Sequence, residues 1–246
     1  RRGECIGCAL RGNEALRGGG YYAPDGGTLR DSLIANNRAM NGAGVYANAS
    51  SATIALCRIS ANVATNNGGG VYCASGASLF SCLIARNEAG HVAGGLYLSG
   101  GTVCNCTISS NMAASGGGVH INSGTVLNGI IHGNSAASQA NWSVGAGTPV
   151  VLYSATAPTN NLPDGRGCIA DEPVFADSTD FRLLEGSPCI NAGTNLVWMA
   201  GASDLDGNPR IHGSRVDMGC YEFVPEPCIA LLLLGLSALL ARRTGP

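Results

Sequence analysis

The sequence predicts an all-β fold, a right-handed parallel β-helix in which the chain winds as a solenoid. Three observations predict it. A branched apolar residue, two variable residues and Asn recur together six times at nearly constant spacing. A glycine pair or triplet before an apolar residue keeps its distance from that pattern. The chain holds 37 glycines, 45% apolar residues and 12% charged residues, which suits short stacked strands joined by tight turns.

Residues 1–140 form the predicted coils, with about 23–26 residues in each. Strand alternation with a two-residue period lies inside each repeat, which favours a β-helix over helical repeats. Equivalent side chains should then line up from coil to coil at ~4.8 Å. The repeated asparagines are Asn13, Asn37, Asn62, Asn87, Asn111 and Asn134.

This asparagine column admits two structural interpretations. Stacked amides carry both donor and acceptor, so they can hydrogen-bond along the solenoid axis. Asparagine also tolerates the left-handed backbone of a turn. The sequence leaves both open.

The predicted core comes from positions that share one face of a strand. The branched residue of each repeat should point inward, and so should the small residue two positions before it. These residues are Ile34, Ile59, Ile84, Ile108 and Ile131, with Cys57, Cys82 and Cys106 among the small ones. By strict alternation, Cys104 faces away from the core and is expected to be partly exposed.

Three tyrosines form a second column, Tyr46, Tyr72 and Tyr97, each beside an inward apolar residue. We expect them to point outward. They are candidates for stacking against sugar rings, although ordinary packing between coils is the favoured interpretation.

Residues 141–163 lose the repeat and are expected to form degenerate coils and a cap. The coils carry few acids, and Glu14 and Glu88 share a column three coils apart, farther than the about 5–10 Å that glycosidases need. We therefore expect no catalytic residues in this chain. Nucleic-acid binding is not expected either, because no dense basic patch is present.

The combined glycine and asparagine patterns resemble the repeats of chlamydial polymorphic outer-membrane proteins, which are surface β-helices. This resemblance implies display outside a cell.

Residues 164–223 have a different, more acidic composition. The runs Asp171–Phe175, Gly186–Gly193, Asp204–Arg210 and Val216–Glu222 together resemble the choice-of-anchor Q domain of bacterial surface proteins. The resemblance implies a module that joins a β-helix to a surface anchor.

Two further hypotheses concern this module. Asp204, Asp206 and Asn208 could bind calcium, because closely spaced carboxylates suit a hard cation; the alternative is an Asx-type turn packed against Arg210. In an oxidising compartment, Cys189 is expected to pair with Cys220.

Residues 224–246 are predicted to be a membrane tail. Val224, Pro225, Glu226 and Pro227 precede an apolar run that ends before Arg242 and Arg243, an order that resembles the PEP-CTERM sorting signal. The resemblance implies an exosortase-type sorting enzyme as a partner. A short transmembrane helix of fourteen residues spans only ~21 Å of a ~30 Å core, and the arginines would lie on the cytoplasmic side.

The sequence as a whole predicts an exported structural or adhesive protein of a Gram-negative-type cell envelope, with extracellular polysaccharide as the candidate ligand. The alternative is a polysaccharide lyase or glycoside hydrolase whose active site lies in missing N-terminal coils. No cofactor is expected apart from the calcium considered above.

Overall fold

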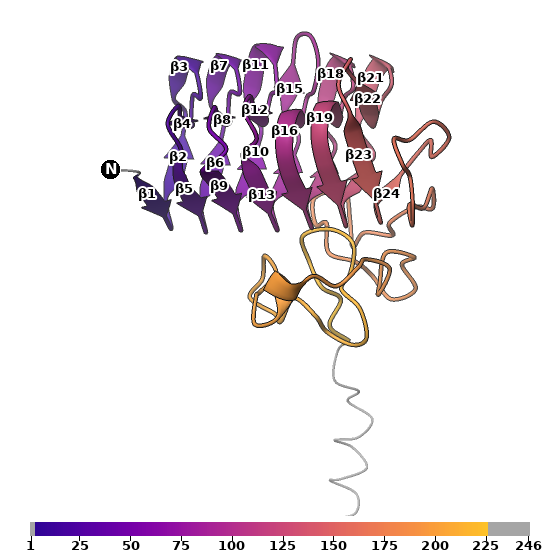
Figure 1. The fold of residues 1–246 in the computed structure, drawn as a ribbon. Coiled ribbons are helices and arrows are strands. Elements are labelled where there is room, and N and C mark those ends of the chain that lie inside the picture. Colours follow the sequence, from indigo (N-terminus) through magenta and orange to yellow (C-terminus); the bar gives the residue numbers. More distant parts are fainter. Residues whose placement is uncertain (1–2, 226–246) are drawn as a thin grey trace, which may run out of the picture.

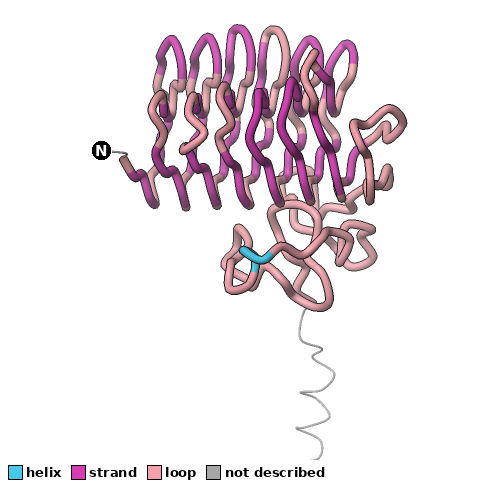
Figure 2. The backbone as a smooth tube through the Cα atoms, in the orientation of Figure 1, coloured by secondary structure: helices cyan, strands magenta, loops and turns pink. Residues whose placement is uncertain are grey.

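The computed structural model describes residues 3–225 and shows a parallel β-solenoid of about six coils (Figure 1). All strand pairs within its three sheets are parallel and join one coil to the next. An irregular C-terminal module packs along one side of the solenoid, as the loops in Figure 2 show. The predicted all-β solenoid is therefore confirmed.

Sheet A is the widest of the three sheets and has two halves. The first half contains β1 (Glu4–Ile6), β5 (Gly27–Arg30), β9 (Ala52–Ala55), β13 (Ser78–Phe80) and β23 (Pro149–Leu152). The second half contains β4 (Tyr21–Ala23), β8 (Val45–Ala47), β12 (Val71–Cys73) and β22 (Trp142–Val144). The long strands β16 (Leu96–Cys104) and β19 (Val119–Leu127) run through both halves and join them.

Sheets B and C complete each coil. Sheet B contains β2 (Ala9–Arg11), β6 (Leu33–Ala35), β10 (Arg58–Ser60), β14 (Leu83–Ala85), β17 (Thr107–Ser109), β20 (Ile130–His132) and β24 (Ala155–Thr156). Sheet C contains β3 (Glu14–Arg17), β7 (Arg38–Asn41), β11 (Val63–Asn67), β15 (Glu88–Ala89), β18 (Met112–Ser115) and β21 (Ser135–Ser138). Residues 141–163 thus still contribute β22, β23 and β24 to the solenoid.

The core follows the predicted columns. The isoleucines of the repeat lie in register on sheet B, with Ile59 opposite both Ile34 and Ile84, and all of them are buried. Cys57, Cys82 and Cys106 are buried two positions before them. Burying each isoleucine contributes roughly 1.5–3 kcal/mol, so a single coil has a modest core and depends on its neighbours.

The asparagine column forms a continuous ladder. Each Nδ2 donates to the Oδ1 of the asparagine in the next coil at 2.9–3.1 Å, from Asn13 through to Asn134. Each backbone N–H donates to the same Oδ1. The ladder ends on Oδ1 of Asn141, at 3.2 Å from Nδ2 of Asn134.

The other interpretation of this column, a left-handed asparagine, is wrong. The residue before each asparagine adopts that conformation, with φ between 52° and 66°. These residues are Gly12, Asn36, Ala61, Arg86, Ser110 and Gly133. The turn therefore frees the asparagine side chain to point into the ladder.

The glycine directly before the apolar residue of each repeat is required by close packing. A Cβ atom placed on Gly70 would lie 2.7 Å from the carbonyl oxygen of Gly95, 2.8 Å from Cγ2 of Ile84 and 2.9 Å from Nδ2 of Asn87. The glycine pattern keeps its distance from the asparagine pattern because these residues touch across coils.

The C-terminal module has little regular structure, with one short 3₁₀ helix, η1 (Val197–Met199). Its side chains cover outward positions of sheet B and of the adjoining edge of sheet A. Cys104 is fully buried there with Met199 and Val216, so the expected partial exposure of this thiol is wrong. In the part of the chain that the structure describes, no helix is long and apolar enough to cross a membrane. The predicted tail helix lies outside that part.

Candidate functional site

Two regions bring the predicted site residues together. One is the tyrosine column on the outer face of sheet A. The other is a buried polar cluster in the C-terminal module. In the tyrosine column Tyr72 and Tyr97 are half-buried, whereas Tyr46 is buried.

The tyrosine side chains stack on one another along the solenoid axis. The ring centroids of Tyr46 and Tyr72 lie 5.0 Å apart and those of Tyr72 and Tyr97 lie 4.4 Å apart, with interplanar angles of 4° and 1°. The stack arises because the three residues are exact register partners in β8, β12 and β16. The predicted column is confirmed as a geometric feature.

The stack is longer than the repeat pattern indicated. Tyr22 extends it at one end, tilted by 50° from Tyr46, and His120 extends it at the other, 5.1 Å from Tyr97. The His120 ring contacts Ser143 Oγ through Nδ1 at 2.8 Å. Both residues occupy the tyrosine position of their coils, which is the sequence signal that could have placed them.

The stacked arrangement restricts what this column can bind. The faces of the central rings cover each other, so their edges and hydroxyl groups are what remain for a ligand. Burial raises the pKa of Tyr72 to about 12, and the neighbouring tyrosines add to the rise, so the phenol stays neutral. Packing between coils therefore accounts for the rings themselves, and sugar stacking on the central ring faces would have to break the stack.

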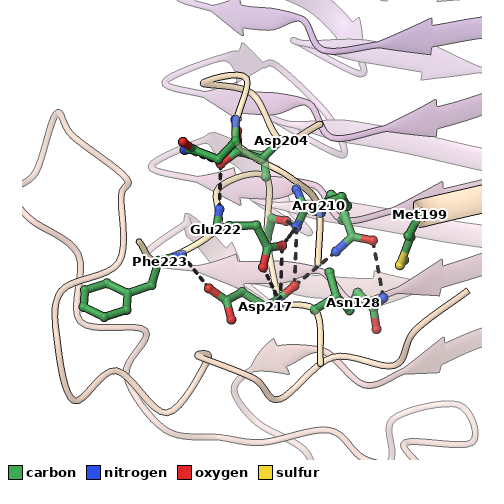
Figure 3. Close-up of polar contacts among 12 residues, drawn as sticks. Asn128, Met199, Asp204, Arg210, Asp217, Glu222 and Phe223 are labelled. Carbon is green, nitrogen blue, oxygen red and sulfur yellow. Dashed lines mark hydrogen bonds and ion pairs between the residues drawn. The ribbon is translucent and has the colours of Figure 1, made fainter. Parts of the chain in front are cut away.

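The buried cluster in the module centres on one ion pair (Figure 3). Arg210 and Glu222 lie 2.8 Å apart, and both side chains are fully buried. Arg210 Nη2 also donates to the Gly219 carbonyl at 2.6 Å. Asp217 lies beside the pair, where its carboxylate accepts the backbone N–H groups of Asn191 and Phe223. Arg210 Nε and Nη1 are buried without a hydrogen-bond partner among the described residues, so the guanidinium is only partly compensated.

Two carboxyl groups of this cluster, those of Glu222 and Asp217, hold their protons more strongly than usual. Burial raises the pKa of Glu222 to about 8, and Asp217 and Asp204 add to the rise, whereas Arg210 opposes it. Burial also raises the pKa of Asp217, against the opposing effect of its two backbone donors. One guanidinium cannot fully compensate three buried carboxylates.

The same cluster joins the module to the solenoid. Asn128, in the turn after β19, donates through Nδ2 to the Thr194 carbonyl at 2.9 Å and accepts the Thr194 N–H at 2.8 Å. Gly219 N–H donates to the Asn128 carbonyl at 2.8 Å. Cys220 N–H donates to Thr107 Oγ1 of β17 at 3.1 Å. Sequence reasoning missed these contacts, because the partners come from segments without a shared pattern.

The proposed calcium ligands do not fit a cation in this arrangement. Asp204 is buried, and its carboxylate accepts N–H groups from Asp206, Asn208 and Glu222. Asp206 is bound on both oxygens by Arg182, at 2.6 and 2.8 Å. An ion would have to displace these donors, so the arrangement fits the alternative, an Asx-type turn. The arginines that bind the turn through the Asp206 carboxylate are Arg182 and, at 3.2 Å, Arg58 of β10, and not the predicted Arg210.

Three further predicted features are a metal-binding cluster, the Cys189–Cys220 disulfide and the tail motif, and the described residues form neither of the first two. Across residues 3–225, no group of three or more His, Cys, Asp or Glu side chains is placed to hold a metal ion. Cys189 and Cys220 are both free and buried, in separate apolar clusters, so the expected disulfide is not formed. Val224 and Pro225 end the described chain; Glu226, Pro227, Arg242 and Arg243 lie outside it.

The acids of the coils lie where the repeat places them. Glu14 pairs in register with Arg38, which pairs with Val63, and Val63 pairs with Glu88. Three rungs at ~4.8 Å separate the two carboxylates by ~14 Å along the axis. Glycosidase carboxylates lie about 5–10 Å apart, so these two do not form such a pair.

No protein-family model, no curated protein and no solved structure matches this chain. The geometry alone defines the class of protein, which is a parallel β-solenoid with a laterally docked C-terminal module. The resemblances to surface-protein repeats, to an anchor module and to a sorting tail stay hypotheses.

Proposed function

We propose that this chain is an exported structural or adhesive protein that is sorted to the cell surface through its C-terminal tail. The order of the sequence motifs supports this proposal: repeated coils, then a module similar to choice-of-anchor Q, then a tail similar to PEP-CTERM signals. The membrane and an exosortase-type enzyme are the partners of the tail. Extracellular polysaccharide is the candidate ligand of the coils.

The observation that carries the proposal is how firmly the module is fixed immediately before the tail. Glu222 N–H donates to Asp204 at 2.9 Å, and Phe223 N–H donates to Asp217 at 2.6 Å. Both acceptor carboxylates are buried. Because the module is also bonded to β17 and to the turn after β19, an anchor acting on the tail would hold the whole solenoid.

A sorting experiment tests the proposal. The chain is produced behind a secretion signal in a Gram-negative bacterium that contains an exosortase, and cell fractions are probed for it. We expect a shortened form at the surface or in the medium. Pro225→Ala combined with Pro227→Ala should leave the uncut form in the inner membrane. Arg11→Ala, an exposed change on the first coil, is the matched control. Equal distributions for all three chains would contradict the proposal.

A further inference from the structure

The outer face of sheet A carries three parallel columns of polar, uncharged side chains, which we call the neutral face. The first is the aromatic column described above. The second is a middle column linked by side-chain hydrogen bonds, from Ser75 to Asn48 at 3.0 Å and from Asn122 to Ser99 at 3.5 Å. The third is a hydroxyl column in strict register: Thr28, Thr53, Ser78, Thr102 and Thr125.

Within four successive coils, the segments that supply this face contain no charged residue; Arg17, from β3, reaches its edge at the first of these coils, with Cζ 5.3 Å from the Tyr46 ring centroid. Residues 45–55, 71–80, 96–104 and 119–127, which supply it, include no Asp, Glu, Lys or Arg. Burial lowers the pKa of His120, so its ring is neutral at pH 7. Charged side chains of the same coils, such as Arg38 and Glu88, project from sheet C instead. The neutrality is therefore a local property of sheet A.

The module leaves this face open. Its apolar contacts on sheet A are with Phe80, Cys104 and Leu127, one column beyond the hydroxyl column. Tyr72, Tyr97 and Thr102 remain half-buried. A rigid face that repeats the same hydroxyl groups at every rung of ~4.8 Å is suited to a ligand that also repeats.

We propose that the neutral face binds a neutral linear polysaccharide that runs along the solenoid axis. Recognition is by hydrogen bonds from sugar hydroxyls to the phenol and threonine hydroxyls, because the central ring faces are already covered. An anionic polymer would lose hydration without gaining a cation from the rungs of Tyr72, Tyr97 and His120, because Arg17 stacks on Tyr46 at the edge of the face, and this disfavours it. The inference deepens the function proposed above and rests on it for the extracellular setting.

Affinity electrophoresis of the purified chain tests the inference. Native gels contain soluble β-glucan, dextran or galactomannan as neutral probes, and alginate or polygalacturonate as anionic ones. We expect at least one neutral probe to retard the chain and neither anionic probe to do so. Two double variants keep the fold and remove hydroxyls only: Tyr72→Phe with Tyr97→Phe, and Thr53→Val with Thr102→Val.

Each double variant should bind about tenfold more weakly, because each lost hydrogen bond costs roughly threefold or more. Thr65→Val, an exposed change on sheet C, is the matched control and should bind as the native chain does. Retardation by no neutral probe, equal retardation by the anionic probes, or unchanged binding of both double variants would overturn the inference. Sorting of the chain is measured separately, so the proposed function can stand if this inference fails.

Discussion

At the scale of single residues, the asparagine ladder explains why one residue type recurs so strictly. Each internal asparagine meets all its donors and acceptors within the solenoid; Nδ2 of Asn87, for example, also donates to the Ile59 carbonyl at 2.9 Å. The register of this column follows from the sequence, because stacking is the physical cause of a constant repeat. Which residue takes the left-handed turn does not, since Asn36, Ala61 and Arg86 share no chemistry.

Replacing Asn87 should destabilise the protein strongly. Asn87→Ala removes the acceptor of two buried donors of Asn62, its backbone N–H and Nδ2, and takes one donor each from the Ile59 carbonyl and Asn111 Oδ1. Each unpaired group costs about 1–3 kcal/mol, so the free energy of unfolding should fall by about 3 kcal/mol or more. Urea unfolding followed by circular dichroism measures it. Asn66→Ala on β11, whose side chain makes no hydrogen bond among the described residues, should change it by less than about 0.5 kcal/mol.

Replacing each of two buried cysteines by serine should lower the free energy of unfolding by different amounts. Cys106 Sγ accepts the Cys82 N–H, and Ser154 Oγ accepts the Gly129 N–H in the same way, so this column already admits serine. Cys73 is fully buried in the apolar core, and its thiol makes no hydrogen bond within residues 3–225. We expect Cys106→Ser to be tolerated within about 1 kcal/mol and Cys73→Ser to cost about 1–3 kcal/mol in urea unfolding. Equal losses of stability in the two variants would show that the hydrogen bond from Cys82 N–H does not stabilise a serine at position 106.

At the scale of elements, the coils and the C-terminal module differ in how far sequence predicts them. Strand order, register and the inward columns follow from the repeat, since each coil is a copy of its neighbour. The module has no repeat, so its docking contacts depend on a single pairing of unlike segments. The burial of Cys104 illustrates this limit: alternation places it outward correctly, but only the module explains why it is covered.

The buried carboxylates of the module should make stability depend on pH. The pKa of Glu222 in the folded state is about 8, above its ordinary value of 4.5, so the folded state holds a proton that the unfolded chain has already lost. The stabilisation that Glu222 contributes is therefore present at low pH and is lost as the pH rises from about 4.5 to about 8. We expect the free energy of unfolding to fall by about 2–3 kcal/mol between pH 5 and pH 8.

Glu222→Gln, which mimics the protonated form, should reduce that slope, whereas Glu185→Gln at an exposed site of the module should leave it unchanged. Urea unfolding at pH 5.0, 6.5 and 8.0 measures the three chains. A slope in Glu222→Gln as steep as in the native chain would assign the pH dependence to other groups, Asp217 first among them.

At the scale of the whole molecule, the amide ladder gives the solenoid a direction. In every amide-to-amide bond Nδ2 donates to the Oδ1 on its C-terminal side, so that end must supply a terminal acceptor, which Asn141 provides. Asn141 in turn donates to the Ala157 carbonyl at 2.9 Å, and Trp142 Nε1 donates to the Pro158 carbonyl at 2.8 Å. The loop after β24 thus closes the last rung, although the repeat pattern has disappeared from the sequence by this point.

Removing the terminal acceptor should loosen the solenoid from its C-terminal end. Asn141→Ala deprives Asn134 of the acceptor for its backbone N–H and for Nδ2, while the ladder from Asn13 to Asn111 keeps its bonds. Because a solenoid is stabilised coil by coil, the loss should stay near the damaged end and not spread evenly. Hydrogen exchange followed by mass spectrometry should therefore show faster exchange in β20 and β21, with β10 and β14 unchanged. Asn160→Ala, an exposed change in the neighbouring loop, is the control. Uniformly faster exchange in all coils would mean that the molecule unfolds as one cooperative unit and that its rungs do not open separately.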